Sequence, residues 1–154
     1  MNCVTITKIF SFEAAHALMD YNGPCKNIHG HSYKLWVTIS GQVDAGTGMI
    51  MDFNDLKKIV YETIISRFDH SLILYGEDKL LNESSMAMTE NLVVLPFNPT
   101  SENLIIYFSE LIKKLLPQHI NLHGLKLYET DSSFTEWFSI DYLTLQDFNN
   151  QTVS

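Results

Sequence analysis

Two stretches of the chain alternate apolar and polar side chains residue by residue, and this alternation constrains the fold more than any other feature. They cover residues 3–12 and 31–43. Successive side chains of a β-strand point to opposite faces of a sheet, so each stretch predicts a strand with one buried face. Residues 20–24 lie between the two and contain Asn-Gly-Pro, a strong turn signal. The apolar row of the second stretch is Tyr33, Leu35, Val37 and Ile39.

Two helices are predicted after these strands. Residues 53–67 carry apolar side chains at helical spacing and follow Asp52, which can cap the helix. Residues 101–115 form a second amphipathic helix. It begins after Thr100, in the N-cap position, and Pro117 prevents its continuation.

Further strands are expected over residues 125–130 and 134–143, and residues 91–95 are a candidate for a short extra strand. The order β-β-α-α-β-β with short connections places the chain in the α+β class. An antiparallel sheet with two helices on one face is the natural packing. The other face also carries apolar and aromatic side chains, so we expect copies of the chain to associate.

The length of 154 residues fits one domain, which we place at residues 1–147, followed by a C-terminal tail at 148–154. The 10 Lys and Arg residues stand against 18 Asp and Glu residues, giving a formal net charge of −8. Nucleic-acid binding rests on many contacts between basic side chains and phosphates, so the charge argues against a nucleic-acid partner. It also argues against a polybasic membrane-surface protein.

The sequence gives no sign of a membrane or secretory destination. No apolar run approaches the roughly 18 residues that a membrane-spanning helix needs. The first residues lack the basic and then apolar regions of a secretory signal. Cys3 and Cys25 are the only cysteines, too few for a disulfide framework. We therefore expect a cytoplasmic protein with no membrane partner.

Three of the six histidines form a candidate metal site. His29 and His31 are two residues apart on a predicted strand, so both side chains point to the same face. A hairpin would bring His16, at the end of the first strand, beside them. Three imidazoles with an open fourth position are typical of catalytic zinc. The alternative is that an isolated His-x-His is only a pair of surface or core histidines.

Cys25 and the pair Asp69-His70 are candidates for proton transfer. A thiolate close to a metal and a lysine has a lowered pKa and can act as base or nucleophile. The alternative for Cys25 is a buried apolar side chain. Asp69 could fix the tautomer of His70 and form a proton relay. Equally, the two residues could only neutralise the C-terminal end of the first helix.

Two acidic residues are candidates for ligand binding. Glu129 lies in an apolar strand, where a carboxylate facing a pocket can accept hydrogen bonds from the N–H groups of a heterocycle. The alternative is a solvent-facing strand residue. Glu102 lies in the first turn of the second helix, where an acid ordinarily compensates the helix dipole.

These motifs and their order resemble the 6-pyruvoyltetrahydropterin synthase family. The resemblance covers about residues 4–143, nearly the whole chain. It is carried by Phe10-Ser11-Phe12-Glu13-Ala14-Ala15-His16, Cys25-x-x-x-His29-Gly30-His31-Ser32-Tyr33, residues 48–57, Phe68-Asp69-His70, residues 98–104 and Leu127-Tyr128-Glu129-Thr130. It implies the tunnelling fold, a four-stranded antiparallel sheet with two helices. Three subunits would join their sheets into a barrel, and two trimers would stack into a hexamer with sites at subunit interfaces.

The resemblance also implies roles for single residues. His16, His29 and His31 would bind Zn²⁺. Cys25 would be the catalytic base, and Asp69 and His70 its relay partners. The substrate would be a pterin triphosphate, 7,8-dihydroneopterin triphosphate. Its binding residues would be Glu129, which anchors the pterin ring, together with Thr100, Ser101, Glu102 and the cation Lys26.

The spacing of the motifs separates the branches of the family. Three residues between Cys25 and His29 resemble the 6-carboxytetrahydropterin synthases of queuosine biosynthesis, which release acetaldehyde and triphosphate. The alternative is a 6-pyruvoyltetrahydropterin synthase, which eliminates triphosphate and typically has a longer gap. A third branch, which feeds folate synthesis, carries a glutamate in this region. An alternative of another class is an oligomeric pterin-binding protein without turnover.

Residues 74–97 form a longer segment than the compact bacterial pattern has.

Overall fold

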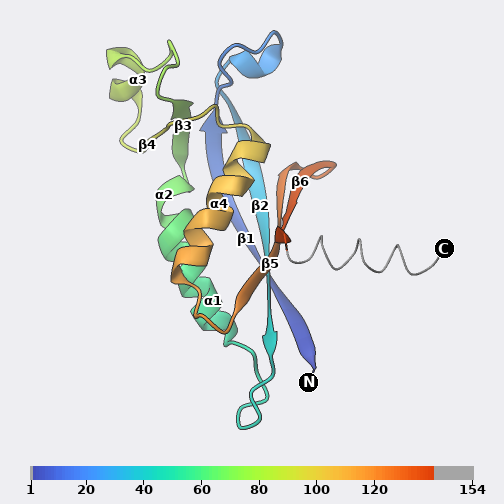
Figure 1. Ribbon diagram of the computed structural model, residues 1–154. Coiled ribbons are helices and arrows are strands. Elements are labelled where there is room, and N and C mark those ends of the chain that lie inside the picture. Colours follow the sequence, from blue (N-terminus) through green and yellow to red (C-terminus); the bar gives the residue numbers. More distant parts are fainter. Residues whose placement is uncertain (1, 141–154) are drawn as a thin grey trace, which may run out of the picture.

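A computed structural model describes residues 2–140, and residues 1 and 141–154 lie outside that description. The described residues form a six-stranded sheet in the order β4-β3-β1-β2-β5-β6 (Figure 1). Its strands are β1 (Cys3–His16), β2 (His29–Gln42), β3 (Ser71–Tyr75), β4 (Leu92–Leu95), β5 (Asn121–Thr130) and β6 (Ser133–Phe138). The α+β class is confirmed. The expectation of four antiparallel strands is wrong, because β3 and β4 extend the sheet beside β1 and both pairings are parallel.

The two additional strands are short. β4 confirms the candidate strand at residues 91–95. β3 was not expected, because four of its five residues are buried and it shows no alternation of apolar and polar side chains. A short apolar run of this kind cannot be assigned from periodicity alone. β3 pairs only with the last residues of β1, from Ala14 to His16.

The central pair of strands is long and regular. β1 and β2 pair without interruption from Cys3 opposite Gln42 to His16 opposite His29. β1 therefore continues four residues beyond the predicted end of the strand at Phe12. This continuation places His16 directly beside the start of β2.

Both predicted helices are confirmed. The first consists of α1 (Phe53–Val60), a π-helical segment η2 (Tyr61–Ile65) and α2 (Ser66–Phe68), which follow one another directly. Its cap is Asp52, whose carboxylate accepts a hydrogen bond of 2.7 Å from the Asn54 amide. The second is α4 (Ser101–Leu115), and the Thr100 hydroxyl accepts a bond of 3.2 Å from the Asn103 amide. Two short helices were not predicted, η1 (Pro24–Lys26) and α3 (Glu83–Met88).

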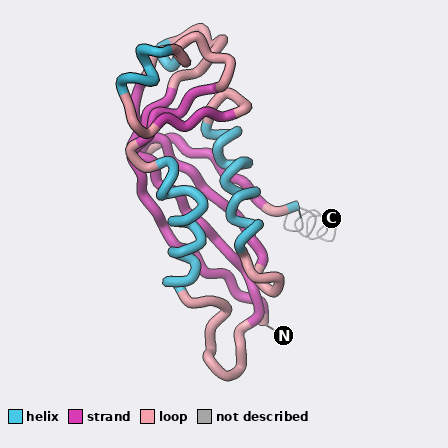
Figure 2. The backbone as a smooth tube through the Cα atoms, turned by 90° about the vertical axis from the view of Figure 1, so that its left-hand side faces the viewer, coloured by secondary structure: helices cyan, strands magenta, loops and turns pink. Residues whose placement is uncertain are grey.

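The two long helices lie side by side on one face of the sheet (Figure 2). The main hydrophobic core lies between these helices and the sheet. Phe12, Tyr33 and Phe108 are among its largest fully buried or nearly fully buried side chains. The predicted apolar row of the second strand is entirely buried. Among residues 2–140, no helix covers the opposite face of the sheet, which exposes large side chains, among them Ile9, Trp36 and Phe134.

Some expectations fall partly outside the described residues. The last strand was predicted at residues 134–143, and β6 covers Ser133–Phe138, while residues 141–143 lie outside. The expected domain end at residue 147 and the tail at 148–154 also lie outside. Within residues 2–140, none of the helices combines the length and hydrophobicity required to cross a bilayer.

Candidate metal centre and its surroundings

The three predicted histidines come together at one end of the sheet. One potential ligand atom from each of His16, His29 and His31 lies within 4.8 Å of the others. The register of β1 and β2 explains this, because His16 pairs with His29 and Ala14 with His31. All four side chains therefore point to the helix-covered face. The ring centroids of the three histidines lie 4.6–5.1 Å apart.

Backbone carbonyls fix the protonation of two of these rings. The Nδ1 atom of His16 lies 2.7 Å from the Pro99 carbonyl, and Nδ1 of His29 lies 2.8 Å from the Asn27 carbonyl. A carbonyl oxygen only accepts hydrogen bonds, so both Nδ1 atoms carry the proton and both Nε2 atoms carry a lone pair. The two Nε2 atoms lie 3.1 Å apart. Two lone pairs at this distance repel each other unless a cation binds between them, so the donor set fits a metal ion.

Burial favours the neutral form of two of these imidazoles, those of His16 and His31. His16 is 2% exposed, and this burial lowers its pKa to about 4. The hydrogen bond to Pro99 opposes the shift, and the neighbouring histidines add to it. Burial also lowers the pKa of His31, whose ring forms a hydrogen bond with the Glu129 backbone. Metals bind the neutral form of imidazole, so the site is ready for a metal at neutral pH.

Glu129 lies at the edge of the three-histidine centre. Its Oε1 atom is 3.9 Å from Nε2 of His16, and its side chain is 26% exposed. The hydroxyl of Tyr33 lies 3.4 Å from Nδ1 of His16. Burial raises the pKa of Tyr33, and the nearby Glu129 carboxylate adds to the shift, so the hydroxyl keeps its proton. The Glu129 carboxylate is thus reachable from solvent at the edge of the three histidines, where a polar ligand could meet it.

The beginning of α4 lies against the same centre. Pro99 provides the carbonyl that binds His16, and α4 begins two residues later. The Thr100 hydroxyl is engaged in capping the helix. The Ser101 hydroxyl lies 2.7 Å from the hydroxyl of Thr135 in β6 and 3.4 Å from the Glu102 carboxylate. Pro99, directly before these predicted substrate-binding residues, is therefore the point at which this segment contacts the three histidines.

The pair Asp69-His70 has the predicted internal contact. Nδ1 of His70 lies 3.1 Å from Oδ1 of Asp69. The Glu13 amide donates a bond of 2.9 Å to the same oxygen. This bond is the main cause of the lowered pKa of Asp69, and the His70 contact adds to it. His70 is held at a φ of 57°, in the left-handed region, and its amide donates to the Glu13 carbonyl over 2.6 Å.

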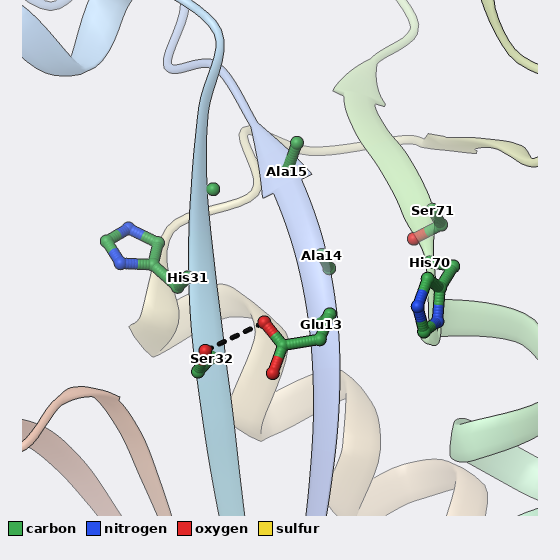
Figure 3. Close-up of a pocket in the computed structure, with 8 residues that line it drawn as sticks. Glu13, Ala14, Ala15, His31, Ser32, His70 and Ser71 are labelled. Carbon is green, nitrogen blue, oxygen red and sulfur yellow. Dashed lines mark hydrogen bonds between the residues drawn. The ribbon is translucent and has the colours of Figure 1, made fainter.

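This pair lies on the other side of β1 from the three histidines, across a cavity that His70 and His31 both line. The rings of His70 and His31 lie on opposite sides of β1 and β2, as Figure 3 shows. The shallow cavity of about 360 Å³ between them is also lined by Glu13 and Ser32, whose side chains are hydrogen-bonded. Within residues 2–140, no hydrogen bond, ion pair or ring contact joins Asp69 or His70 to the three histidines.

Cys25 and Lys26 lie in η1, in the loop between β1 and β2. The Cys25 carbonyl accepts a bond of 2.9 Å from the Leu18 amide, and its side chain is partly exposed. Cys25 is not part of the described group of close ligand atoms. Lys26 lines a separate cavity of about 470 Å³ with acidic residues and Lys79. The long segment 74–97 forms one wall of that cavity.

Two contributors to the site were not anticipated from the sequence. Tyr33 was expected only as a core residue, because its row on the strand is apolar. Asn98 exchanges two side-chain hydrogen bonds with the backbone of Met19, of 3.0 and 2.9 Å. Its carbonyl also accepts a bond from the Asn103 side chain. Asn98 thus ties the loop after β1 to the beginning of α4. The available signal was an Asn-Pro pair directly before a helix cap.

Comparison with known proteins agrees with this geometry. A family model described as 6-pyruvoyl tetrahydropterin synthase matches residues 5–139. The chain belongs to this family. The 6-carboxy-5,6,7,8-tetrahydropterin synthase of Haemophilus influenzae is 34% identical over 140 residues, which are 86% of this chain and 96% of that protein. The human 6-pyruvoyl tetrahydrobiopterin synthase is 31% identical, covering 83% and 86%.

A solved structure of the same family has a similar fold. The 6-pyruvoyl tetrahydropterin synthase of Caenorhabditis elegans superposes with a TM-score of 0.67 at 27% identity. The match covers 90% of this chain and 97% of that chain. The overall fold of this chain is therefore similar to that of a solved member of the family.

Proposed function

We propose that this protein is a zinc-dependent 6-carboxy-5,6,7,8-tetrahydropterin synthase. It would convert 7,8-dihydroneopterin triphosphate to 6-carboxytetrahydropterin and release acetaldehyde and triphosphate, in the pathway to queuosine. The observation that carries the proposal is the three-histidine centre with the carboxylate of Glu129 at its edge. The names of the Haemophilus influenzae relative and of a Rickettsia typhi relative, 33% identical, support this activity.

The metal ligands in this proposal are His16, His29 and His31. Zn²⁺ held by these three imidazoles would supply Lewis acidity for an oxygen of the substrate side chain, which would make the adjacent C–H bond more acidic. The carbonyls of Pro99 and Asn27 hold two of the rings in the tautomer that presents Nε2. Such partners outside the coordination shell orient the ligands and raise their basicity.

The pterin ring is bound by the residues beside this centre. The carboxylate of Glu129 accepts hydrogen bonds from the amino and ring N–H groups of the pterin. Thr100, Ser101 and Glu102, at the beginning of α4, line the ring. Hydrogen bonds to an ionised acceptor are among the stronger ones, so Glu129 fixes the orientation of the substrate. Lys26 is the nearest cation in sequence for the triphosphate.

Proton transfer is assigned to Cys25 and the pair Asp69-His70. Cys25 would take a proton from a carbon of the substrate side chain. His70 gives or accepts a proton on another face of the substrate. Asp69 holds the Nδ1 side of the imidazole, which leaves Nε2 of His70 as the transferring atom. His70 is exposed, so it can reach a substrate that is bound at the metal centre of a neighbouring subunit.

We further propose that the protein works as a homo-oligomer, a trimer or a dimer of trimers, with sites at subunit interfaces. Two features support this arrangement. The uncovered face of the sheet exposes large apolar side chains, among them Ile9 and Trp36. The pair Asp69-His70 also lies apart from the three histidines of its own chain. A second subunit would bring the two groups together.

A subunit-mixing experiment tests the shared site. A His16→Ala chain and an Asp69→Asn chain are purified separately, dissociated and reassembled together. If each site draws residues from two chains, the mixture recovers part of the activity that each variant has lost. If every site lies within one chain, the mixture stays as inactive as its parents.

The nearest alternative is a 6-pyruvoyltetrahydropterin synthase, the activity in the name of the human relative. The three residues between Cys25 and His29 favour the carboxy-forming reaction. The decisive experiment gives zinc-loaded protein 7,8-dihydroneopterin triphosphate and identifies the products by mass. Acetaldehyde with 6-carboxytetrahydropterin supports the proposal, and a 6-pyruvoyl product without acetaldehyde favours the alternative. No turnover with zinc bound would indicate a pterin-binding protein without catalysis.

A further inference from the structure

The residue just before the cap of α4 makes the contact that orients His16. Pro99 is buried, and its carbonyl accepts the hydrogen bond of 2.7 Å from Nδ1 of His16. The two residues are 83 positions apart in the chain, so local sequence does not bring them together. Proline has a fixed φ and no amide proton, so Pro99 cannot be anchored by a hydrogen bond that its own backbone donates. The position of its carbonyl therefore depends on the residues on either side.

Asn98 provides an anchor on one side of this proline. Its Oδ1 atom accepts a hydrogen bond of 3.0 Å from the Met19 amide, and its Nδ2 atom donates one of 2.9 Å to the Met19 carbonyl. Two parallel bonds of this kind fix the orientation of both partners, which a single bond does not. Met19 follows His16 by three residues. The side chain of Asn98 thus joins the segment that carries the imidazole to the segment that carries its acceptor.

The cap of α4 holds the other side. The Asn98 carbonyl accepts bonds of 2.8 Å from the Thr100 amide and 2.9 Å from the Asn103 side chain. The Thr100 hydroxyl in turn accepts a bond from the Asn103 amide. These contacts fix Pro99 relative to α4. The side chain of Asn98 fixes it relative to the segment of His16, so the two sets of bonds together hold the carbonyl against the ring.

We propose that Asn98 is a positioning residue for the metal centre. By binding Met19, it keeps the Pro99 carbonyl on Nδ1 of His16 and so directs Nε2 of this ring toward the ion. Groups that orient metal ligands from outside the coordination shell change metal affinity by about 10–100-fold. The inference rests on the proposed function, which assigns zinc to the three histidines. It goes further in naming a residue outside that centre which controls its affinity.

The test compares Asn98→Ala with Asn91→Ala. Asn91 is also half-buried, and its side chain donates a bond of 3.0 Å to the Asp69 carbonyl, so it links two segments through the same chemistry. Competition with a chromogenic chelator measures zinc affinity, and urea unfolding of the metal-free proteins measures the stability that each has lost. We expect zinc binding to weaken at least about tenfold in Asn98→Ala. Asn91→Ala should lose stability but keep the zinc affinity of the unmodified protein.

Nuclear magnetic resonance of the metal-free, ¹⁵N-labelled protein provides a second reading. A buried, hydrogen-bonded N–H group exchanges slowly with water, so Nδ1–H of His16 should give a protected proton signal. We expect this signal in the unmodified protein and in Asn91→Ala, and its weakening or loss in Asn98→Ala. If Asn98→Ala does not fold, Asn98→Asp takes its place. It keeps the size and the acceptor for the Met19 amide but cannot donate to the Met19 carbonyl, so the same changes are expected.

A folded Asn98 variant with the zinc affinity of the unmodified protein would overturn the inference. Equal losses of zinc affinity in the Asn98 and Asn91 variants would also overturn it, because Asn98 would then act only through stability. If the unmodified protein binds no zinc, the proposed function fails. The His16 signal then still decides the role of Asn98, since an unchanged signal in its variant would contradict the inference.

Discussion

The three-histidine centre and the pair Asp69-His70 use the same kind of side chain in opposite surroundings. His16 is 2% exposed, and a backbone carbonyl fixes its tautomer. The His70 side chain is 79% exposed, at a backbone turn of positive φ, with one carboxylate as its partner. The first environment keeps imidazoles neutral and aimed at one point. The second leaves an imidazole that an approaching molecule can reach.

This contrast shows how one residue type serves two kinds of chemistry. Metal binding needs lone pairs that are arranged before the ion arrives, and burial with fixed acceptors provides them. Proton transfer needs a group whose pKa stays near the working pH and which can reach the substrate. The metal centre should therefore tolerate changes at Asp69 and His70, while turnover should depend on both regions.

The largest expected effect separates the two regions directly. Replacing His16 with Ala removes a ligand, so we expect zinc affinity to fall by more than about 100-fold, since even partners outside the coordination shell are worth 10–100-fold. His70→Ala is the matched control and should keep one zinc per chain. Metal content after dialysis, measured by mass spectrometry, gives the comparison. Equal zinc loss in both variants would break the distinction.

Cys25→Ala should abolish turnover without affecting the metal. General bases contribute about 10²–10⁴-fold to a rate, so we expect turnover to fall at least 100-fold. Zinc content should stay at one per chain, because Cys25 is outside the group of close ligand atoms. Cys3→Ala, at the exposed beginning of β1, is the control and should keep full activity. Loss of zinc from Cys25→Ala would make Cys25 a ligand instead of a base.

Acid should destabilise the metal-free protein through His16. In the unfolded chain His16 takes up a proton near pH 6.5, whereas in the folded protein its pKa is about 4. The unfolded state therefore binds more protons between these values, and the free energy of unfolding falls as the pH is lowered through this window. The contribution is about 3 kcal/mol. Urea unfolding at pH 7 and pH 4 measures it, and His16→Gln should show a smaller decrease. An equal decrease in both would contradict the assignment to His16.

Asp69→Asn should give the smallest effect of the series. Asn carries no charge to pair with His70 and orients its ring less strongly, so we expect the turnover rate to fall about tenfold. Neopterin affinity and zinc content should not change. The turnover rate at saturating substrate, with Asp55→Asn on the surface of α1 as control, provides the measurement. An unchanged rate would leave Asp69 with a purely structural role at the end of α2.

The sequence was sufficient for the parts of the fold that rest on long periodic patterns. The apolar row from Tyr33 to Ile39 predicted β2, and the caps Asp52 and Thr100 predicted both long helices. β3 escaped prediction because four of its five residues are buried and show no alternation of apolar and polar side chains. Its parallel pairing with β1 depends on contacts between segments more than fifty residues apart, which no local pattern encodes.

The candidate site was predictable to a similar degree. The two-residue spacing of His29 and His31 on a strand indicated that both side chains point to one face. The expected pairing of the two strands added His16 as a third ligand. The supporting groups were not visible in the sequence, because Pro99 and Asn27 act through backbone carbonyls that every residue possesses. Tyr33 was hidden by its place in an apolar row, where a hydroxyl looks incidental.

Anomalous X-ray diffraction at the zinc absorption edge tests the central claim most directly. Crystals of the protein grown with zinc should show one strong anomalous peak per chain, within bonding distance of Nε2 of His16, Nε2 of His29 and one ring nitrogen of His31. Glu129 should lie beside the peak without binding to it. The absence of a peak at the three histidines, or a peak at His70 instead, would contradict the account.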